Sequence, residues 1–362
     1  MNIVQVTGMR STKFGGLEKF FLEMARILHK RGDSLFLVYN EQPRSEEYLT
    51  QLRECAAELV IMDFNSATGW SMIKNYVKLI KKTKADIVHF HFGAFPHNYF
   101  IIPRLIGPPK IYRTIHSIPF YSSQISIFSK IRFKLMNMFY DRLLPVSEAI
   151  KEQVVKAVGN DRNIYTRYIG TNIEANRIKE KNENIVNICC IAFHQPIKGI
   201  DILLNALHKL KYLHKFSTFR LTQIGGGFDN YKKELEEQVD KLQLKENVIF
   251  YGLSNNVPEL LSDMDIYVQP SRSEGIGIAL MEAASQKLPL IGSNIGGIPE
   301  IIIDGHNGFL FPVEDSETLA EKLYILCTDE EKRKKMGENA RRTIEEKFDL
   351  VTNVRRLVNE LY

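Results

Sequence analysis

The sequence predicts an α/β protein made of two domains, each built on a parallel sheet with helices on both faces. Three observations support this prediction. The chain has 362 residues, which is long for a single hydrophobic core. Short apolar runs rich in β-branched residues alternate with stretches of helical periodicity, as is typical of parallel sheets. A polar segment without strong periodicity, residues 173–185, interrupts the alternation and is expected to be a linker.

The first domain is expected to span residues 1–172. Its strands are predicted at residues 2–7, 34–39, 58–62, 86–91, 111–116 and 143–147, and its helices at 17–31, 45–56, 70–84 and from 147 onward. Ligands of such sheets gather at the carboxyl ends of the strands, so the loops that follow the strands are the expected place for a site.

The second domain is expected to span residues 186–345, followed by a terminal segment, residues 346–362. Its strands are predicted at residues 185–193, 219–225, 247–252, 266–270 and 288–292, with helices at 200–214 and 229–243 and a helical region from residue 318 onward. The same alternation in both halves predicts two sheets of one kind.

The overall composition is that of an ordinary globular protein, with 44% hydrophobic and 25% charged residues. No apolar run reaches the roughly 18 residues that a membrane span requires, and no leader pattern opens the chain, so a cytoplasmic location is expected. The four cysteines show neither metal-binding nor disulfide spacing, and we expect buried thiols.

The charge is divided unevenly along the chain. Residues 1–180 hold 26 Lys and Arg against 16 Asp and Glu, whereas residues 181–362 hold 22 against 27. A basic first half indicates an acidic partner, and the absence of a nucleic-acid-binding motif favours an anionic membrane surface. Residues 120–141 are apolar around most of a helix and contain Lys130, Arg132 and Lys134, so they predict either a buried helix or a helix on the membrane surface.

The richest motif lies between residues 271 and 300. A helix is expected from about Gly275, and with no side chain at Gly275 or Gly277 its first amides form an anion site favoured by the helix dipole. Glu274 and Glu282 lie eight residues apart, which is roughly 12 Å along a helix at about 1.5 Å per residue. Two carboxylates flanking a phosphate site suit a sugar nucleotide, although a capping carboxylate and a solvated face are the simpler alternative.

The pattern EGxGxxxxEAxxxxxPLIGSNxGGxPE in this motif resembles the retaining glycosyltransferases of family 4. The resemblance implies the GT-B fold, with two facing Rossmann-like domains, the active site in the cleft between them, and a last helix that packs back onto the first domain. It also implies a nucleoside-diphosphate sugar, expected to carry uridine. Glu282 would bind the ribose and Glu274 the sugar, while the diphosphate would be bound by Lys198 and the amides of residues 275–278 (Gly275, Ile276, Gly277 and Ile278).

The resemblance also implies site residues in the first half. Gly15 and Gly16, at the start of the first helix, would contact the donor phosphate, and His116, at the end of a strand, would face the transferred sugar. His89 and His91 share one face of their strand because side chains alternate with period two. Without a third ligand, this pair favours a structural or substrate-facing role over zinc. The expected catalytic residues are Glu274, His116 and Lys198.

One position departs from the family pattern, since Phe193 stands where an arginine usually binds phosphate. The expected replacements are Arg10, Lys13 and Arg272, with Arg10 favoured because it would reach the diphosphate when the domains close. Leu253 and the glycines at 225–227 are expected to form walls around the base.

No metal or other cofactor is expected. Asp263 and Asp265 form a DxD sequence, but they precede a strand and are therefore expected at the amino end of the sheet, away from the site.

Together these features predict a retaining hexosyltransferase that uses a UDP-sugar and a polysaccharide or lipid-linked acceptor. It is expected to be peripheral at the inner face of the cell membrane. Two alternatives stay open: a sugar-nucleotide epimerase of the same architecture, and a non-catalytic subunit that binds nucleotide sugars. The missing arginine is the one feature that favours the last of these.

Overall fold

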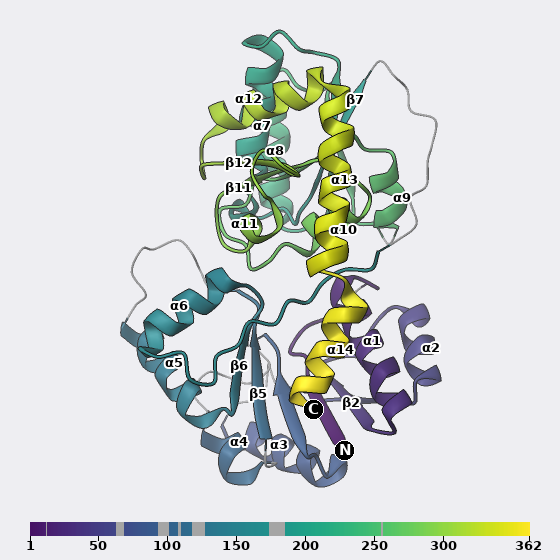
Figure 1. The fold of residues 1–362 in the computed structure, drawn as a ribbon, viewed down its shortest axis with the longest axis vertical. Helices are drawn as coiled ribbons and strands as arrows, with labels where there is room; N and C mark the ends of the chain where they lie inside the picture. Colours follow the sequence, from purple (N-terminus) through teal and green to yellow (C-terminus); the bar gives the residue numbers. More distant parts are fainter. Residues whose placement is uncertain are drawn as a thin grey trace. The chain divides into compact units, whose positions relative to one another are not determined.

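The computed structural model describes residues 1–11, 13–62, 69–92, 101–107, 110–117, 127–173, 185–254 and 256–362. They form two compact units (Figure 1). Unit 1 contains the described residues up to Ile169 together with Leu350–Tyr362, and unit 2 contains those of Gly170–Asp349. The expected linker, residues 173–185, lies outside the described residues except at its two ends.

Unit 1 is a six-stranded parallel sheet with helices on its faces. Its strands are β1 (Asn2–Val6), β2 (Ser34–Tyr39), β3 (Glu58–Ile61), β4 (Ile87–Phe90), β5 (Lys110–Ile115) and β6 (Arg142–Pro145), in the order β3-β2-β1-β4-β5-β6. Its helices are α1 (Gly16–Arg31), α2 (Glu46–Glu54), α3 (Trp70–Thr83), α4 (Ile101–Ile106), α5 (Ile127–Phe139), α6 (Glu148–Val158) and α14 (Leu350–Leu361).

Unit 2 has a second six-stranded parallel sheet. Its strands are β7 (Val186–Ile191), β8 (Phe219–Ile224), β9 (Val248–Gly252), β10 (Ile266–Gln269), β11 (Leu290–Ser293) and β12 (Gly308–Phe311), in the order β12-β11-β10-β7-β8-β9. Its helices are the 3₁₀ helix η1 (Pro196–Lys198), α7 (Ile200–Tyr212), α8 (Asp229–Lys241), α9 (Val257–Ser262), α10 (Ile278–Ser285), α11 (Ile298–Ile301), α12 (Ser316–Thr328) and α13 (Glu330–Lys347). Counted along the chain, both sheets have the order 3-2-1-4-5-6, which is that of doubly wound dinucleotide-binding folds.

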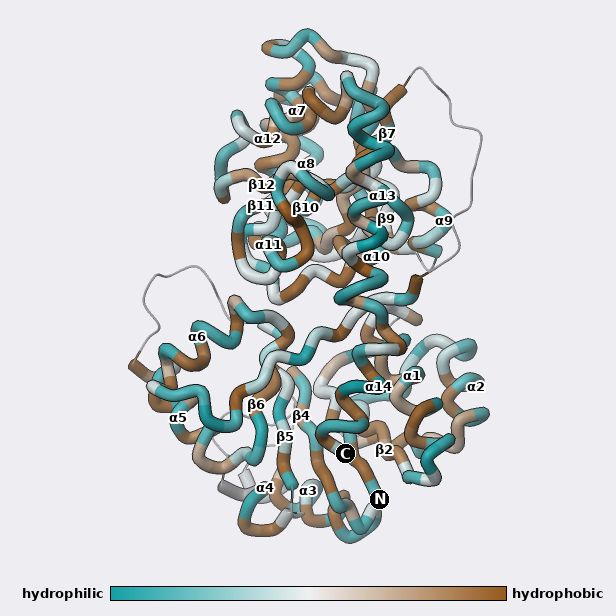
Figure 2. Tube along the Cα trace, viewed as in Figure 1, coloured by the Kyte–Doolittle hydropathy of each residue, from teal (hydrophilic) through white to brown (hydrophobic). Residues whose placement is uncertain are grey.

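Burial explains why these sheets form. The central strand β10 is buried on both faces, with Ile266, Tyr267 and Val268 fully inaccessible to solvent, as expected for a parallel strand covered by helices. In Figure 2, β10 is coloured as hydrophobic, whereas α13 is mostly hydrophilic and buries only one side. The prediction of two parallel α/β sheets is therefore confirmed.

α14 completes unit 1 although it lies at the far end of the sequence. It packs along α1, and its hydrophobic residues Val354, Leu357 and Val358 are buried. Side-chain hydrogen bonds anchor its end, since Tyr112 Oη donates to the Leu361 carbonyl at 3.0 Å and Gln5 Nε2 donates to Tyr362 Oη at 2.8 Å. Residues more than 300 positions apart thus form one core.

Several predicted boundaries were wrong. The helix expected from Gly275 begins at Ile278, because Gly277 has a left-handed φ of 88°, which a right-handed helix cannot continue. Glu274 and Glu282 are therefore not separated by two helical turns. The helix expected over residues 120–141 is α5, residues 127–139, while residues 118–126 lie outside the described part. Five short elements, α4, η1, α9, α11 and β12, were not predicted.

Candidate active site

The point in unit 2 where the strand order reverses lies between β7 and β10, which are neighbours in the sheet. At such a point the connections from the two strands run in opposite directions, and a crevice forms outside their carboxyl ends. The loop after β7 contains Lys198, and the loop after β10 contains Glu274. The topology therefore places two of the predicted site residues at the same edge of the sheet.

Lys198 and Glu274 form an ion pair. Lys198 Nζ lies 2.9 Å from Glu274 Oε2, and the two side chains are 24% and 14% exposed. The same oxygen accepts hydrogen bonds from Gln269 Nε2 and Ser271 Oγ, both at 3.2 Å. Because three donors converge on one oxygen, the carboxylate is held in a fixed position beside the lysine.

The close approach of the two loops depends on Gly199. Its φ is +65°, and an added Cβ atom would lie 1.9 Å from the carbonyl oxygen of Pro270. Any side chain at this position would push the β7 loop away from the β10 loop. Gly199 therefore allows Lys198 to reach Glu274, and we infer no direct contact of Gly199 with a ligand.

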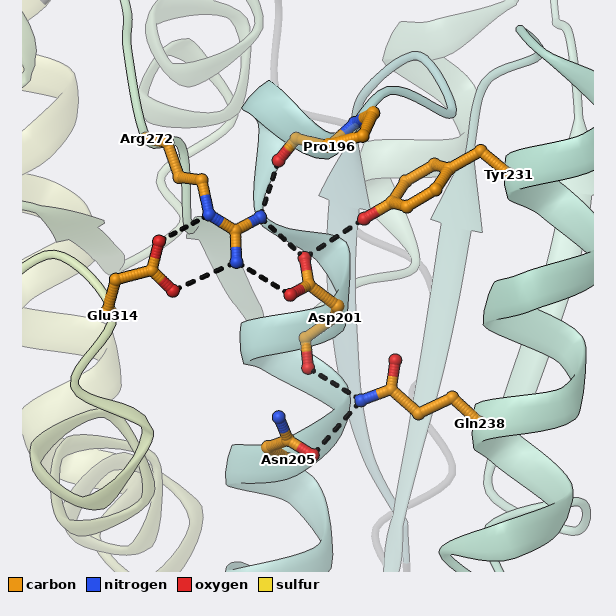
Figure 3. A network of polar contacts seen from close by, with 7 residues as sticks. All are labelled: Pro196, Asp201, Asn205, Tyr231, Gln238, Arg272 and Glu314. Atoms are coloured by element: carbon orange, nitrogen blue, oxygen red, sulfur yellow. Dashed lines mark hydrogen bonds and ion pairs between the residues drawn. The ribbon is translucent and has the colours of Figure 1, made fainter. Parts of the chain in front are cut away.

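Arg272 also holds these two loops together, through the contacts drawn in Figure 3. Nε and Nη2 donate to Glu314, Nη1 and Nη2 donate to Asp201 at 2.8 and 2.7 Å, and Nη1 also donates to the Pro196 carbonyl. These bonds use all five N–H groups of the guanidinium. Arg272 therefore has no donor left for a phosphate unless this network breaks, which argues against it as the replacement for the missing arginine.

Asp201, in the first turn of α7, is the centre of this network. Besides Arg272 it accepts a hydrogen bond from Tyr231 Oη at 3.0 Å, and Gln238 bridges its carbonyl to Asn205 (Figure 3). Burial alone would raise the pKa of Asp201, but the hydrogen bonds and charge of Arg272 outweigh it, so the pKa lies below its usual range. Arg272, with its two ionised partners Asp201 and Glu314, therefore links the loops after β7, β10 and β12.

The loop from Glu274 to Gly277 presents unpaired backbone donors. Gly275, Ile276 and Gly277 are buried, and within the described residues no acceptor is paired with their amides or with that of Ile278. Buried amides without partners are unusual, and ahead of a helix they form a site for an anion. The loop packs closely on Gly297, whose added Cβ would lie 2.4 Å from the Gly275 carbonyl oxygen.

The remaining predicted residues of unit 2 lie on two neighbouring parts of the sheet edge. Glu282 is half-buried on α10. Phe193 is 48% exposed in the loop after β7, and the next residue, His194, pairs with Gly227 after β8. Leu253, after β9, covers Gly226, where an added Cβ would lie 3.1 Å from Leu253 Cγ. Phe193 and Leu253 are both exposed apolar side chains in loops at the carboxyl edge of the sheet, and we call this pair the apolar rim.

In unit 1 the corresponding point lies between β1 and β4. The loop after β1 is closed by Glu18, which accepts hydrogen bonds from Ser11 Oγ at 2.8 Å and from the Gly15 amide at 3.0 Å. Burial raises the pKa of Glu18. The Gly15 amide is therefore engaged within the loop, which limits its predicted role as a phosphate donor. Arg10 is exposed and lies 3.7 Å from Glu41.

The histidines of unit 1 form a buried cluster at this edge. His89 and His91 are inaccessible to solvent and stack with their ring centres 4.4 Å apart, which confirms that they share one face of β4. His116, at the end of β5, is half-buried and stacks on Phe92 at 3.9 Å. Burial, reinforced by the nearby charge of Arg113, lowers the pKa of His116 to about 3.

The structure thus brings together Lys198 and Glu274 in unit 2, and separately the histidine cluster in unit 1. Gly15 and Gly16 follow β1 at the same edge of that sheet. Sequence reasoning missed Gln269, Asp201 and Glu314. A buried glutamine at a strand end and an aspartate two residues after Gly199 were available signals, because polar residues there face the carboxyl edge of the sheet. Nothing in the sequence around Glu314 pointed to its pairing with Arg272.

Within the described residues, no group of three His, Cys, Asp or Glu side chains is placed to hold a metal ion. Asp265 lies at the amino end of its strand, where its carboxylate accepts a hydrogen bond from the Asn187 amide at 2.8 Å, so that placement was predicted correctly. No helix in the described part of the chain has the length and apolar character needed to cross a bilayer.

Two doubly wound sheets, with a lysine, a carboxylate and free amides at one switch point, define a two-domain α/β protein of the nucleotide-binding class. Comparison with known proteins specifies the class further. Residues 14–175 match the model "Glycosyltransferase Family 4", and residues 171–343 match "Glycosyl transferases group 1". The chain belongs to this family of glycosyltransferases and has the GT-B fold.

Three relatives illustrate the similarity. The chain is 27% identical over 364 residues to the Escherichia coli UDP-Gal:alpha-D-GlcNAc-diphosphoundecaprenol alpha-1,3-galactosyltransferase, covering 96% of this chain and 93% of that protein. It is 27% identical over 292 residues to the N-acetyl-alpha-D-glucosaminyl L-malate synthase of Bacillus anthracis, covering 77% and 74%. The crystal structure of Anabaena Alr3699/HepE with UDP and glucose superposes with a TM-score of 0.80 at 20% identity, covering 100% and 99%.

Proposed function

We propose that this glycosyltransferase is a retaining hexosyltransferase that takes its sugar from a UDP-sugar and transfers it to a glycan or lipid-linked acceptor. One observation carries the proposal: at the switch point of unit 2, Lys198, Glu274 and a loop of unpaired amides meet within a single small region. A cation and bare amides suit a diphosphate, and a fixed carboxylate suits sugar hydroxyls.

The diphosphate is the leaving group in this proposal, so its developing negative charge is what the site must stabilise. Lys198 supplies a fixed positive charge, and the amides of residues 275–278 supply fixed hydrogen-bond donors. Groups that are already in place need not reorganise during the reaction, and such preorganisation is the usual source of large rate enhancements.

Because protein groups supply this charge, we propose that transfer needs no divalent metal. Excess EDTA should leave the rate unchanged, and loss of activity that manganese restores would refute metal independence.

Other residues of unit 2 complete the donor site in this proposal. Glu274 accepts hydrogen bonds from the transferred sugar, and Glu282 accepts them from the ribose. The apolar rim of Phe193 and Leu253 covers the base, since both side chains are exposed at the same sheet edge. The names of two similar proteins, one a UDP-Gal transferase and one crystallised with UDP, support uridine as the base and a hexose as the sugar.

In unit 1 we assign His116 to a hydroxyl of the transferred sugar and Gly16 to a phosphate contact. The replacement for the arginine missing at Phe193 falls to Arg10 or Lys13, since Arg272 is saturated by its own partners. Arg10 is mostly exposed and only loosely paired with Glu41, so it is free to rearrange. Nucleotide affinity that is unchanged in both Arg10→Ala and Lys13→Ala would remove this assignment.

For the acceptor side, α5 carries an exposed apolar surface bordered by basic residues. Ile127, Phe128 and Met138 are more than half exposed, and Lys130 and Lys134 are exposed beside them. An amphipathic basic surface of this kind suits an anionic bilayer, with up to about 1 kcal/mol of attraction per basic residue at low salt. We expect flotation with phosphatidylglycerol vesicles and not with phosphatidylcholine vesicles, and no binding to either would refute membrane docking.

The activity is tested with a panel of UDP-glucose, UDP-galactose and UDP-N-acetylglucosamine, scoring UDP release with and without a prenyl-diphosphate-linked sugar. Retention is read from the anomeric configuration of the new linkage by NMR.

Glu274→Gln should abolish UDP release, whereas the matched control Glu317→Gln, at an exposed carboxylate of unit 2, should not. Conversion of the donor sugar without UDP release would identify an epimerase, and UDP binding without turnover of any donor would identify a binding subunit.

A further inference from the structure

A continuous chain of side-chain hydrogen bonds crosses the interior of unit 1 and ends at His116. It runs from Thr114 through His89 to Tyr362, then through Gln5 and His91 to His116. His89 Nε2 lies 2.7 Å from Thr114 Oγ1, His89 Nδ1 contacts Tyr362 Oη, and Gln5 Nε2 lies 2.8 Å from Tyr362 Oη. His91 Nε2 lies 2.8 Å from Gln5 Oε1, and His91 Nδ1 lies 3.1 Å from His116 Nε2.

The direction of every bond follows from Gln5. Its amide nitrogen can only donate and its oxygen can only accept. Since Oε1 faces His91, His91 must carry its proton on Nε2, and its Nδ1 must then accept a hydrogen bond from His116 Nε2–H. On the other side, Tyr362 Oη accepts from Gln5 and donates its own proton to His89 Nδ1, so His89 donates from Nε2 to Thr114.

This chain has only two self-consistent directions. If the Gln5 amide were turned over, each bond would reverse and His116 would carry its proton on Nδ1. The hydrogen bonds couple all six side chains, so none can change alone without leaving a buried polar group unpaired, which is unfavourable. The orientation of Gln5 in the structure selects the direction in which His116 Nδ1 bears no proton.

The imidazoles are held neutral, as this argument requires. Burial lowers the pKa of His89 to about 3 and holds the pKa of His91 well below its usual range. Among the described groups around them, Arg113 from β5 adds positive charge that opposes protonation of His91 and His116. No hydrogen bond from a described residue reaches His116 Nδ1.

We propose that Tyr362, Gln5 and His91 are positioning residues that fix the tautomer of His116, so that its Nδ1 accepts a hydrogen bond from a hydroxyl of the transferred sugar. The first half of this inference stands on the hydrogen-bond chain alone, and the second half rests on the proposed function. Tyr362 thereby acts on His116 through the side chains of Gln5 and His91, and does not itself contact a substrate.

The tautomers can be read directly from long-range ¹H–¹⁵N NMR spectra of protein labelled with ¹⁵N-histidine. In the parent protein, we expect His116 to be protonated on Nε2 and unprotonated on Nδ1. Tyr362→Phe removes the oxygen that joins Gln5 to His89, so we expect the Nδ1 signal of His116 to shift toward the protonated form. The matched control Tyr112→Phe also removes a hydroxyl bonded to α14 but lies outside the chain, and it should leave the tautomer unchanged.

Gln5→Glu provides a second variant that tests the direction independently. A carboxylate accepts from both neighbours, so His116 should keep its proton on Nε2, while the His89 proton should move from Nε2 to Nδ1. A proton on Nδ1 of His116 in the parent, or an unmoved His116 signal in Tyr362→Phe, would overturn the positioning role.

The link to the sugar is tested with the donor that the panel identifies. Tyr362→Phe should lower kcat about tenfold and leave the affinity for UDP alone unchanged, whereas Tyr112→Phe should preserve both. An unchanged kcat in Tyr362→Phe, together with a shifted tautomer, would overturn the sugar contact. If the tautomer behaves as expected and no donor is turned over, the positioning role stands and the proposed function fails.

Discussion

The two sheets have the same strand order, yet the side chains at their switch points differ in kind. At the switch point of unit 1 the buried side chains His89, His91 and Gln5 are neutral. Gln5 is hydrogen-bonded to His91 directly and to His89 through Tyr362. In unit 2 the corresponding edge is built from charges, with Lys198 paired to Glu274 and Arg272 paired to two carboxylates.

The difference shows that topology determines where a site lies, whereas the side chains determine what it binds. A neutral, buried set of donors and acceptors can orient hydroxyl groups without attracting charge. A partly exposed lysine held in place beside unpaired backbone amides can attract a phosphate. The two units therefore divide the proposed reaction, with recognition of sugar hydroxyls in unit 1 and stabilisation of the leaving diphosphate in unit 2.

The largest expected effect comes from removing the charge at the switch point of unit 2. Lys198→Ala should lower turnover by about 10²–10³-fold, the range found when one preorganised group that stabilises a developing anion is lost. The measurement is UDP release under saturating donor. Lys209→Ala is the control, since Lys209 also pairs with a glutamate in unit 2 but on the surface. Equal rates in the two variants would contradict the division between the units.

The next effect concerns the stability of the charged edge. Arg272→Ala should destabilise unit 2 by about 1–3 kcal/mol, because it removes the charged hydrogen bonds to Asp201 and Glu314, both of which are partly exposed. Arg272→Lys should recover little of this loss, since an ammonium cannot reproduce five directed donors. Chemical denaturation followed by a probe in unit 2 gives the free energy, with the exposed Arg220→Ala as control. A full recovery by lysine would show that charge alone holds the loops.

The neutral edge of unit 1 should respond to pH instead. His89 has a folded pKa of about 3 and an unfolded value near 6.5, so between these values the unfolded chain binds more protons. Stability is therefore present above pH 6.5 and is lost as pH falls, by up to about 1.4 kcal/mol per pH unit for each such histidine. Thermal melts between pH 7 and pH 4.5 should show this slope, and His89→Gln should reduce it. A slope that is unchanged in His89→Gln would show that other groups cause it.

The smallest expected effect is at Glu18. Glu18→Gln keeps an acceptor for one of its two partners and loses one for the other, so we expect a loss of about 1 kcal/mol in the free energy of unfolding. Because burial raises the pKa of Glu18, removing its charge should offset part of that loss. A loss greater than about 3 kcal/mol would mean that the carboxylate charge itself is required for the loop.

The sequence was sufficient for most of the fold, because buried parallel strands such as β10 are short apolar runs and carry a strong local signal. It was insufficient for β12, an edge strand of four residues, GFLF, that follows a turn and has little periodicity. The start of α10 was also mispredicted. A left-handed glycine at 277 ends the loop there, and backbone dihedral angles at glycine cannot be read from residue identity.

For the candidate site, single residues were predictable and their pairings were not. Lys198 and Glu274 were each identified from their own motif, but their ion pair spans 76 residues and depends on strand order. Arg272 was expected to be available for phosphate, because its partners Asp201 and Glu314 lie 71 and 42 residues away. Long-range pairing of charges is a property of the tertiary fold, whereas the motif describes only its own stretch of chain.

The position of α14 has a consequence for how the protein is made. Tyr362 meets Gln5 across a sequence separation of 357 residues and His89 across 273. On the ribosome, at about 5–20 residues per second, the first sheet must wait tens of seconds for its last helix. All residues of unit 2 emerge before that helix does. Unit 2 can therefore finish folding first, although it is translated second, while the nascent unit 1 exposes the hydrophobic surface that α14 will cover.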